Sequence, residues 1–314
     1  MPIIRDLEYF PEAARHGAVA IGNFDGVHRG HLEIVRRLIE RAREVNGPAI
    51  VFTFDPHPVR LLRPEQCPPP LTWTERKAQL LAEHGVNKVV AYPTDEQLLR
   101  LSAQEFFDSI VCNLLQARAI VEGPNFYFGH NREGNVELLS QLASRAGLTL
   151  DVVPPVEIDG GLVSSSRIRE LIADGKVANA RGLLSAPYRI RGMVTHGAGR
   201  GAKLGFPTAN LEAIDTLLPG VGVYAGRAWL NTTSYPAAIH IGPNPTFGEA
   251  ALKVEIHLLD FHDVLYGQPL EVEFVDQIRN TCTFESEASL VAQLEQDVHR
   301  TREITSRELG SETS

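Results

Sequence analysis

The sequence predicts two domains of different fold class, an α/β domain built on a parallel sheet and then a small antiparallel β-barrel with a C-terminal helix. The first domain is indicated by apolar, strand-like runs that alternate with helical patterns from residue 18 to 184, as in successive βαβ units. The second is indicated by short alternating runs, separated by Gly and Pro, from residue 188 onward. We therefore expect domains at 1–185 and 186–305 and a disordered tail at 306–314.

In the first domain, short apolar runs predict the strands and helical periodicity predicts the segments between them. We expect strands at 18–21, 49–54, 86–92, 119–121 and 148–153, and helices at 31–39, 75–83, 103–115 and 136–146. Ligands of open parallel sheets bind beyond the carboxyl ends of the strands. The functional residues of this domain should therefore lie in the loops that leave those strands.

The loop Gly22–His31, between the first strand and the first helix, is the strongest candidate site. Its glycines allow sharp turns and the close approach of a ligand, and the helix start that follows attracts phosphate. His28 and His31 can both donate to one anion, or neutralise charge on a leaving pyrophosphate. The alternative is a glycine turn with two partly exposed histidines.

Two further loops carry polar and aromatic side chains. Asp55 follows the second strand in an Asp-Pro-His-Pro segment, for which a stiff, extended loop without a chemical role is the alternative. Phe126 and Phe128 follow the strand at 119–121. They either form a small packing cluster or wall a flat aromatic ligand such as an isoalloxazine, with Asn125 bonded to the polar edge of that ligand.

The serines at 164–166 begin the last helical run of this domain, and one of them is expected to cap the helix. Arg167 and Arg169 lie in the first turn, where positive charge opposes the helix dipole. This unfavourable placement indicates an anionic ligand at that end of the helix.

The second domain should contain strands at 188–195, 223–230, 237–241, 252–259 and 270–274 and an amphipathic helix at 287–304. Its glycine-rich segment 196–210 frees the backbone to surround phosphates. Thr208 and Asn210 offer oxygen atoms of the kind that Mg²⁺ accepts. A mobile hairpin loop is the alternative interpretation of this segment.

Composition and charge limit the classes of function. A chain of 314 residues with 43% hydrophobic and 22% charged residues is typical of a globular protein. We expect a cytoplasmic protein without a membrane partner, because we find neither a signal-peptide pattern nor a run of about 18 apolar residues. The net charge of −9 argues against nucleic-acid binding. Cys67, Cys112 and Cys282 predict neither a disulfide framework nor a zinc site.

The segments GNFDGVHRGH, TFDPHP, EGPNFYFG and SSSRIR occur in this order and resemble the amino-terminal module of the bacterial bifunctional riboflavin kinase/FAD synthetases. The HxGH signature at 28–31 is that of the Rossmann-like nucleotidyltransferases. The resemblance covers residues 15–185 and implies FMN adenylyltransferase activity, with His28 and His31 as catalytic residues. It implies ATP binding at Gly22, Phe24, Asp25, His28, Gly30, His31, Ser164, Ser165 and Arg169 and flavin binding at Asp55, Asn125, Phe126 and Phe128.

The segments GFPTAN, GVYAG, IGPNPTF and KVEIHLLDF resemble the riboflavin kinase module across residues 185–305. The resemblance implies that Glu255 removes the proton of the ribityl hydroxyl and that Thr208 and Asn210 hold the magnesium nucleotide. It further implies a nucleotide site at Gly199, Gly205, Pro207, Thr208 and Asn210 and flavin contacts from Arg279 and Phe284. Thr281 stands where this family usually carries a glutamate.

The resulting hypothesis is a bifunctional enzyme of flavin cofactor synthesis. Its C-terminal domain would phosphorylate riboflavin to FMN, and its N-terminal domain would adenylylate FMN to FAD with release of pyrophosphate, each with ATP and Mg²⁺. One alternative, motivated by Thr281, is an FMN adenylyltransferase whose barrel binds flavin or regulates and has only weak kinase activity. Another is a non-enzymatic flavin sensor. We expect riboflavin, FMN, FAD and ATP as ligands, and a monomer or weak homo-oligomer.

Overall fold

The computed structural model describes residues 3–197, 199–244 and 249–312. It divides into two compact units: unit 1 is Met1–Pro68 with Thr72–Ser165, and unit 2 is Pro69–Leu71 with Ser166–Ser314. Helices α7 (Ser165–Ala173) and α8 (Val177–Leu183) fall largely in unit 2, where α8 packs against the barrel strand β14 (Pro269–Arg279). The two units divide after Ser165, about 20 residues before the domain boundary expected at residue 185. The boundary between the two functions stays a prediction.

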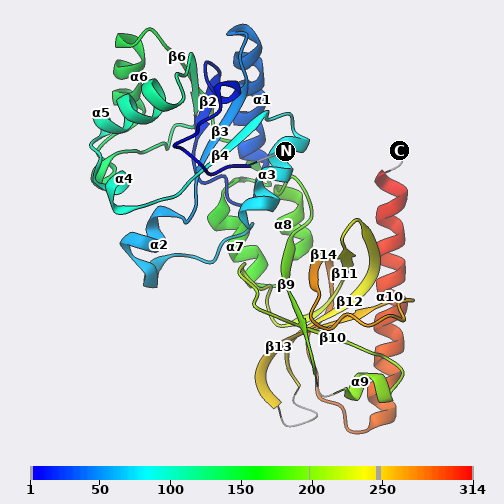
Figure 1. Cartoon of the computed structure of the whole chain (residues 1–314). Helices are drawn as coiled ribbons and strands as arrows, with labels where there is room; N and C mark the ends of the chain where they lie inside the picture. Colours follow the sequence, from blue (N-terminus) through cyan, green and yellow to red (C-terminus); the bar gives the residue numbers. More distant parts are fainter. Residues whose placement is uncertain (1–2, 198, 245–248, 313–314) are drawn as a thin grey trace. The chain divides into compact units, whose positions relative to one another are not determined.

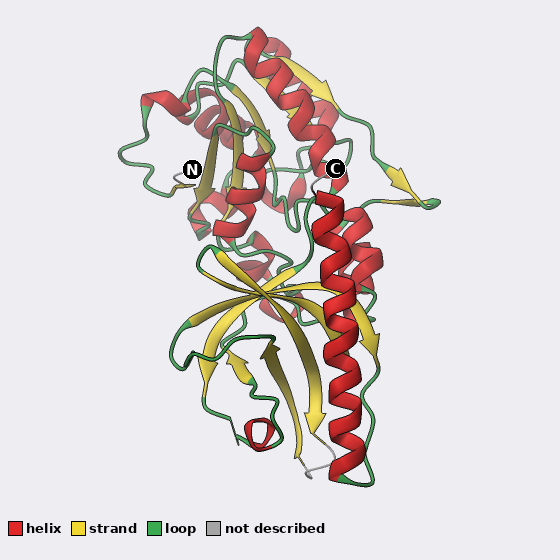
Figure 2. Cartoon of the chain, turned by 90° about the vertical axis from the view of Figure 1, so that its right-hand side faces the viewer, coloured by secondary structure: helices red, strands yellow, loops and turns green. Residues whose placement is uncertain are grey.

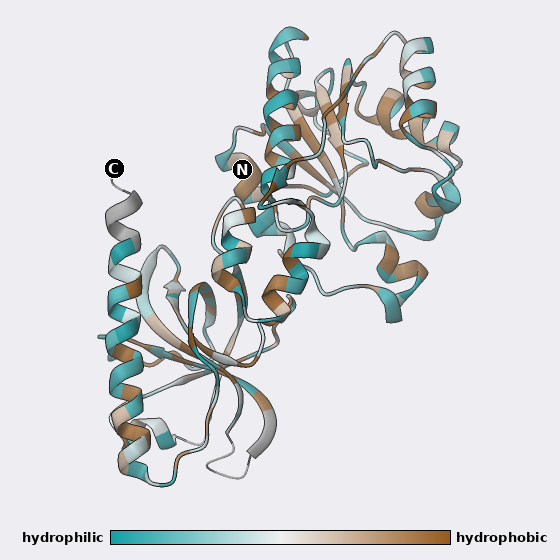
Figure 3. Ribbon diagram, turned by 180° about the vertical axis from the view of Figure 1, so that it is seen from behind, coloured by the Kyte–Doolittle hydropathy of each residue, from teal (hydrophilic) through white to brown (hydrophobic). Residues whose placement is uncertain are grey.

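Unit 1 is built on a parallel sheet with the strand order β1-β4-β3-β2-β5-β6, as the sequence predicts (Figure 1). Its strands are largely apolar (Figure 3), and β2 is buried along its whole length. The order reverses between β2 and β5, and such switch points open the crevice in which ligands bind. The strands are β1 (Ile3–Ile4), β2 (Ala18–Ile21), β3 (Ala49–Phe54), β4 (Lys88–Tyr92), β5 (Ala119–Glu122) and β6 (Thr149–Val152).

The helices of unit 1 follow the predicted periodicity, with short elements added between them. The expected helix at 103–115 is formed by α5 and by the π-helix η3 that continues it. The elements are η1 (Glu12–Ala14), α1 (Arg29–Glu44), α2 (Pro58–Leu62), η2 (Pro64–Gln66), α3 (Thr74–Glu83), α4 (Glu96–Arg100), α5 (Ala103–Phe106), η3 (Phe107–Leu114), η4 (His130–Arg132) and α6 (Val136–Arg145), with a hairpin of β7 (Glu157–Ile158) and β8 (Gly161–Leu162).

The segment after β3 differs from the extended loop that its two prolines predict. The Asp55–Pro56 peptide bond is cis. Pro58 begins helix α2, and the His57 side chain caps that helix by accepting from Val59 N. Proline is favoured at the first helical position because its fixed φ suits a helix and no N–H is required there. The prediction of an extended loop was therefore wrong at Pro58.

Unit 2 contains a closed barrel with the strand order β10-β13-β12-β11-β14-β9, which confirms the predicted antiparallel barrel (Figure 2). Tyr224 and Phe274 are fully buried and meet edge to face, with 5.4 Å between ring centroids. The other elements are β9 (Arg189–Thr195), α9 (Arg200–Lys203), β10 (Ala209–Glu212), β11 (Gly222–Leu230), β12 (Thr233–Asn244) and β13 (Glu249–Leu258). Helix α9 and the start of strand β10 lie in the segment 196–210, for which a mobile hairpin loop was the alternative interpretation.

Helix α10 (Glu287–Glu312) packs against β11, β12 and β14 and runs beside the barrel (Figure 2). It continues past Ile304 to Glu312, farther than the helical pattern at 287–304 predicts, and the expected disordered tail at 306–314 stays a prediction. Residues 313–314 lie outside the described part of the chain. In the part that is described, none of the helices combines the length and the apolar character that crossing a membrane requires.

Candidate functional site

The loop between β2 and α1 has a strained backbone at the carboxyl edge of the sheet. Phe24, Gly26 and Val27 have positive φ angles of 47°, 83° and 40°. Residues other than glycine rarely adopt this backbone conformation, and such strain is concentrated at functional sites. Gly30 matters for a different reason, because an added Cβ would lie 3.2 Å from the His28 ring, a tight contact that would press on it.

His28 and His31 cap the start of helix α1 for one another. The backbone N–H of each donates to Nδ1 of the other, both at 3.3 Å, and the two rings stack with 3.6 Å between their centroids. Because Nδ1 accepts in both rings, each neutral imidazole carries its proton on Nε2. Both rings therefore keep one N–H donor for a ligand.

Burial sets the charge of this histidine pair. It lowers the pKa of His28 to about 4, although the nearby Asp25 opposes the shift. It also lowers the pKa of His31 well below the usual range, and His28 and Lys77 lower it further. Both rings are consequently neutral near pH 7 in the ligand-free protein. This favours hydrogen-bond donation over the charge neutralisation that the sequence also suggested.

Asp25 and Ser165 tie the loop in place. Asp25 is buried, and its carboxylate accepts from the Thr72 backbone N–H at 3.1 Å and from the Thr72 hydroxyl at 3.3 Å. The Ser165 hydroxyl donates to the carbonyl oxygen of Asp25 at 2.9 Å. These bonds hold the backbone of the loop from two sides.

Lys77 is a buried cation beside this loop that the sequence analysis missed. Its side chain on α3 is 7% exposed and donates to the Thr53 hydroxyl at 3.3 Å. Burial lowers its pKa, and the carboxylates of Asp25 and Asp55 oppose that shift. Lys77 lies one helical turn from Leu81, so a lysine on an apolar helix face was the signal that could have identified it.

The flavin-binding residues predicted for unit 1 differ in their surroundings. Phe128 is a core residue whose ring stacks on Phe126 with 5.4 Å between centroids, whereas Asn125 is exposed. Asp55 accepts from the Thr74 hydroxyl at 2.8 Å. Their roles toward a flavin stay predictions, as does the role of Arg169, which lies in unit 2 and donates from Nε to Pro69 O at 3.0 Å.

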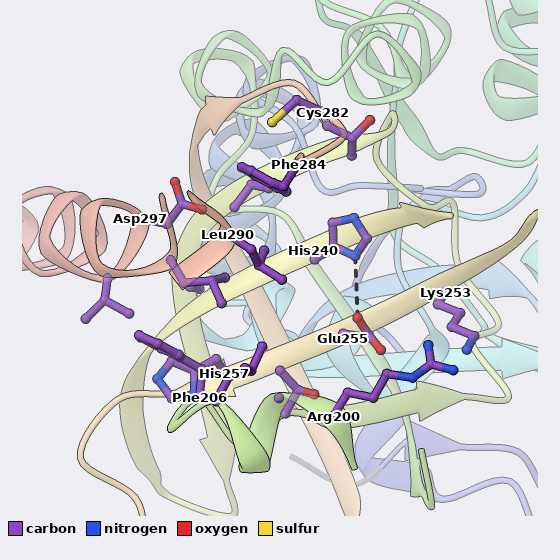
Figure 4. A pocket seen from close by; sticks show the side chains of 18 of the residues that line it. Arg200, Phe206, His240, Lys253, Glu255, His257, Cys282, Phe284, Leu290 and Asp297 are labelled. Atoms are coloured by element: carbon purple, nitrogen blue, oxygen red, sulfur yellow. Dashed lines mark ion pairs between the residues drawn. The ribbon is translucent and has the colours of Figure 1, made fainter. Parts of the chain in front are cut away.

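Unit 2 contains a pocket of about 170 Å³ beside the barrel (Figure 4). Of the predicted kinase residues, the pocket is lined by Gly199, Thr208, Asn210, Glu255, Arg279 and Phe284. Gly205 and Pro207 adjoin lining residues without lining it themselves. Lining residues that the sequence analysis missed are Arg200, Phe206, His240, Lys253, His257 and Asp297. Part of the motif IGPNPTF, residues 245–247, lies outside the described residues.

Two glycines allow close packing within the glycine-rich segment 196–210 beside this pocket. A Cβ on Gly197 would lie 2.0 Å from Nδ2 of Asn210, and a Cβ on Gly201 would lie 2.3 Å from the Phe206 carbonyl oxygen. Asn210 lies on β10 opposite Glu255 of β13, so barrel pairing brings the amide and the carboxylate together. Glycine at 197 and 201 thus allows close packing against Asn210 and Phe206, respectively.

Glu255 has a histidine across the neighbouring strand. His240 of β12 is its cross-strand partner, and His240 Nδ1 lies 3.7 Å from Glu255 Oε2 (Figure 4). The side chains are 23% and 21% exposed. Sequence reasoning missed this pair because the strand register that joins residues 240 and 255 was not known.

Arg279 and Asp297 close one side of the pocket. Asp297 on α10 is 2% exposed, and its carboxylate accepts from Arg279 Nε at 2.9 Å and Nη2 at 2.7 Å. The Arg279 guanidinium also lies over the Phe284 ring, 5.8 Å from its centroid. Thr281 lines the same pocket. The acidic partner of Arg279 is therefore supplied by α10, although residue 281 is not acidic.

Comparison with known proteins assigns a family to each unit. The FAD synthetase family model matches residues 10–167, and the riboflavin kinase family model matches residues 184–305. Curated relatives named bifunctional riboflavin kinase/FMN adenylyltransferase include proteins from Pseudomonas fluorescens and Escherichia coli strain K12. The first is 35% identical over 305 residues, 97% of this chain and 98% of the relative. The second is 35% identical over 310 residues, 98% of this chain and 97% of the relative.

A solved structure described as a macrolide-efflux protein from Streptococcus pneumoniae is similar over both units, with a TM-score of 0.84 and 33% identity. The similarity covers 96% of this chain and 98% of that chain.

Fold and site together define a two-domain transferase, with a nucleotidyltransferase domain followed by a flavokinase barrel. The chain belongs to the family of bifunctional riboflavin kinase/FMN adenylyltransferases, which act in flavin cofactor synthesis. Because both domains are present over nearly their full length, the bifunctional hypothesis is favoured over an adenylyltransferase with a merely regulatory barrel.

Proposed function

We propose that the pocket of unit 2 phosphorylates riboflavin to FMN with Glu255 as the general base. The ribityl hydroxyl would attack the γ-phosphorus of ATP while the carboxylate accepts its proton, and ADP would leave. One observation carries the proposal: a single pocket is lined both by the residues predicted for the nucleotide, Thr208 and Asn210, and by those predicted for the flavin, Arg279 and Phe284.

The residues around Glu255 fit a magnesium ion that is bound together with the nucleotide. Thr208 and Asn210 offer neutral oxygen atoms, which suit a hard cation. Thr195 lies opposite Asn210, and its buried hydroxyl has no hydrogen-bond partner among the described residues. Within the same residues, no cluster of three or more His, Cys, Asp or Glu side chains could hold a metal. Phosphate and water would supply the remaining ligands, and the bound ion would neutralise charge on the phosphates.

We further propose that unit 1 joins FMN to the AMP moiety of ATP. A phosphate oxygen of FMN would attack the α-phosphorus, and pyrophosphate would leave. The Nε2–H groups of His28 and His31 are suited to donate to phosphate oxygens beside the N-terminus of α1. Lys77 supplies the buried positive charge that two neutral imidazoles lack.

The setting of these reactions is part of the proposal. The net charge of −9 supports a protein that does not bind nucleic acid. We also propose that the enzyme acts in the cytoplasm as a monomer or weak homo-oligomer, with riboflavin, FMN, FAD and ATP as its ligands.

The role of Glu255 is tested by Glu255→Gln in the full chain. The amide cannot accept the hydroxyl proton, so phosphorylation of riboflavin should slow by about 10²- to 10⁴-fold, as is usual for loss of a general base. Conversion of added FMN to FAD should continue, because every described residue that lines the pocket of Glu255 belongs to unit 2. Riboflavin, FMN and FAD are separated by chromatography over time.

The matched control is Glu212→Gln, the same change at an exposed position of the barrel strand β10. This variant should phosphorylate riboflavin at the wild-type rate. A Glu255→Gln enzyme that made FMN as fast as the control would contradict the proposed base.

A further inference from the structure

His240 is a half-buried side chain in the kinase pocket that the mechanism above does not use. It faces Glu255 from the neighbouring strand, with 3.7 Å between Nδ1 and Oε2. His240 Nδ1 is buried and has no hydrogen-bond partner among the described residues. A buried polar atom without a hydrogen-bond partner lowers the stability of the fold. Its presence beside a predicted catalytic carboxylate therefore needs an explanation.

The opposite edge of the His240 ring is packed against the barrel and the segment that follows β14. A Cβ on Gly242 would lie 3.4 Å from His240 Nε2, 3.2 Å from the methyl group of Thr281 and 3.1 Å from a methyl group of Val221. Glycine at 242 thus keeps a further side chain away from this edge of the ring. The Nδ1 edge is directed toward Glu255 (Figure 4).

We propose that His240 is a positioning residue of the kinase site, whose Nδ1–H donates to Glu255 Oε2 and fixes the orientation of the carboxylate. This inference rests on the proposed role of Glu255 as the base. Hydrogen bonds of catalytic groups are often long without substrate and tighten in the substrate complex. A shift of less than about 1 Å would bring Nδ1 and Oε2 to hydrogen-bond distance.

The proposal requires only a neutral imidazole with its proton on Nδ1. Held by that bond on one oxygen, the carboxylate presents its other oxygen to the ribityl hydroxyl. A base that rotates freely would meet the hydroxyl in the reactive geometry less often, and misplacement by about 1 Å can cost roughly 100-fold in rate. Loss of His240 should therefore slow the chemical step more than it weakens riboflavin binding.

The test compares His240→Leu with His240→Asn in the full chain, in single turnovers and in steady-state assays of riboflavin with ATP and Mg²⁺. Leu removes the donor, and the rate should fall by about 10- to 100-fold while the KM for riboflavin stays close to that of the wild type. Asn carries an N–H donor near the position of Nδ1 and should restore most of the rate. Riboflavin binding, followed by quenching of flavin fluorescence, shows that the barrel of each variant is folded.

Both changes are repeated on the Glu255→Gln background, where His240 has no carboxylate to position and should have little further effect. His299→Leu, at an exposed histidine of α10, is the matched control. A His240→Leu enzyme with wild-type turnover would overturn the inference. So would a His240→Asn enzyme as slow as His240→Leu, or a full additional loss on the Glu255→Gln background. A Glu255→Gln enzyme with wild-type turnover would instead overturn the proposed base.

Discussion

The buried side chain of Glu122 takes the place of a backbone hydrogen-bond partner at the end of β2, where the loop to His28 begins. Strand β2 pairs with β5 through Ala18 and Val19, and beyond them Ile21 N donates to Glu122 Oε1 at 2.6 Å. Glu122 is 3% exposed, and burial raises its pKa well above the usual 4.5. The carboxyl group thus satisfies a backbone N–H at the strand switch point in its protonated form.

This protonation makes the stability of unit 1 depend on pH. Below pH 4.5 Glu122 is protonated in both the folded and the unfolded chain. As the pH rises above that value, the unfolded chain ionises first, so stability is lost by up to about 1.4 kcal/mol per pH unit. Glu122→Gln cannot ionise and should gain stability relative to the wild type across this range.

The measurement uses tryptophan fluorescence. Trp73 lies in unit 1 and Trp229 in unit 2, so both forms are made on a Trp229→Phe background and unfolded in urea between about pH 5 and about pH 7. Parallel stability curves for the two forms would show that Glu122 does not titrate as expected.

At the scale of elements, the connection from β14 to α10 is held by a buried ion pair. Asp297 is 2% exposed and anchors Arg279. The pair Arg302–Asp260 also joins α10 to the barrel, but its side chains are 48% and 67% exposed. Breaking a buried pair leaves an uncompensated charge, whereas exposed pairs contribute about 1 kcal/mol or less.

Asp297→Asn should therefore loosen the segment between Arg279 and Phe284 and raise the KM for riboflavin by about 10-fold, equivalent to about 1.4 kcal/mol. Asp260→Asn should leave this KM close to the wild-type value. Hydrogen exchange at 280–286 gives an independent readout and should accelerate only in Asp297→Asn. Equal effects of the two substitutions would refute the distinction between the buried and the exposed pair.

The elements that the sequence predicted are those with a strong local pattern. Strand β2 is an uninterrupted apolar run, β3 is apolar except for Thr53, and α6 has clear helical periodicity. Strand β10 was missed because its four residues, ANLE, are partly polar and lie in a glycine-rich segment. The predicted end of α10 was too early because the apolar periodicity stops at Ile304 and polar residues follow, whereas the helix continues to Glu312.

The candidate sites, like the elements, were predicted only where a local sequence pattern marks them. Motif order predicted Glu255, Thr208 and Asn210, which line one pocket. The partners His240 and Asp297 depend on strand register and on how α10 packs, and neither is encoded in a local pattern. Local sequence therefore predicts which groups carry the chemistry better than it predicts which groups hold them.

For the whole molecule, the two candidate sites belong to different units. His28 and His31 lie in unit 1, whereas the described lining of the kinase pocket lies in unit 2. We expect FMN to leave the kinase pocket into solution before a nucleotidyltransferase site binds it. The two activities should then be separable by substitution and should complement each other between different chains.

The test mixes two variants, each defective in one activity. His28→Ala should lose about 10²- to 10³-fold in adenylyl transfer, because it removes one donor to the phosphates, and should still make FMN. Glu255→Gln should make almost no FMN but should convert FMN to FAD. Neither alone should form FAD from riboflavin at an appreciable rate, whereas their mixture should do so after a lag in which free FMN accumulates. If the mixture accumulated FMN without forming FAD, although Glu255→Gln adenylylated added FMN, FMN would not be exchanging through solution.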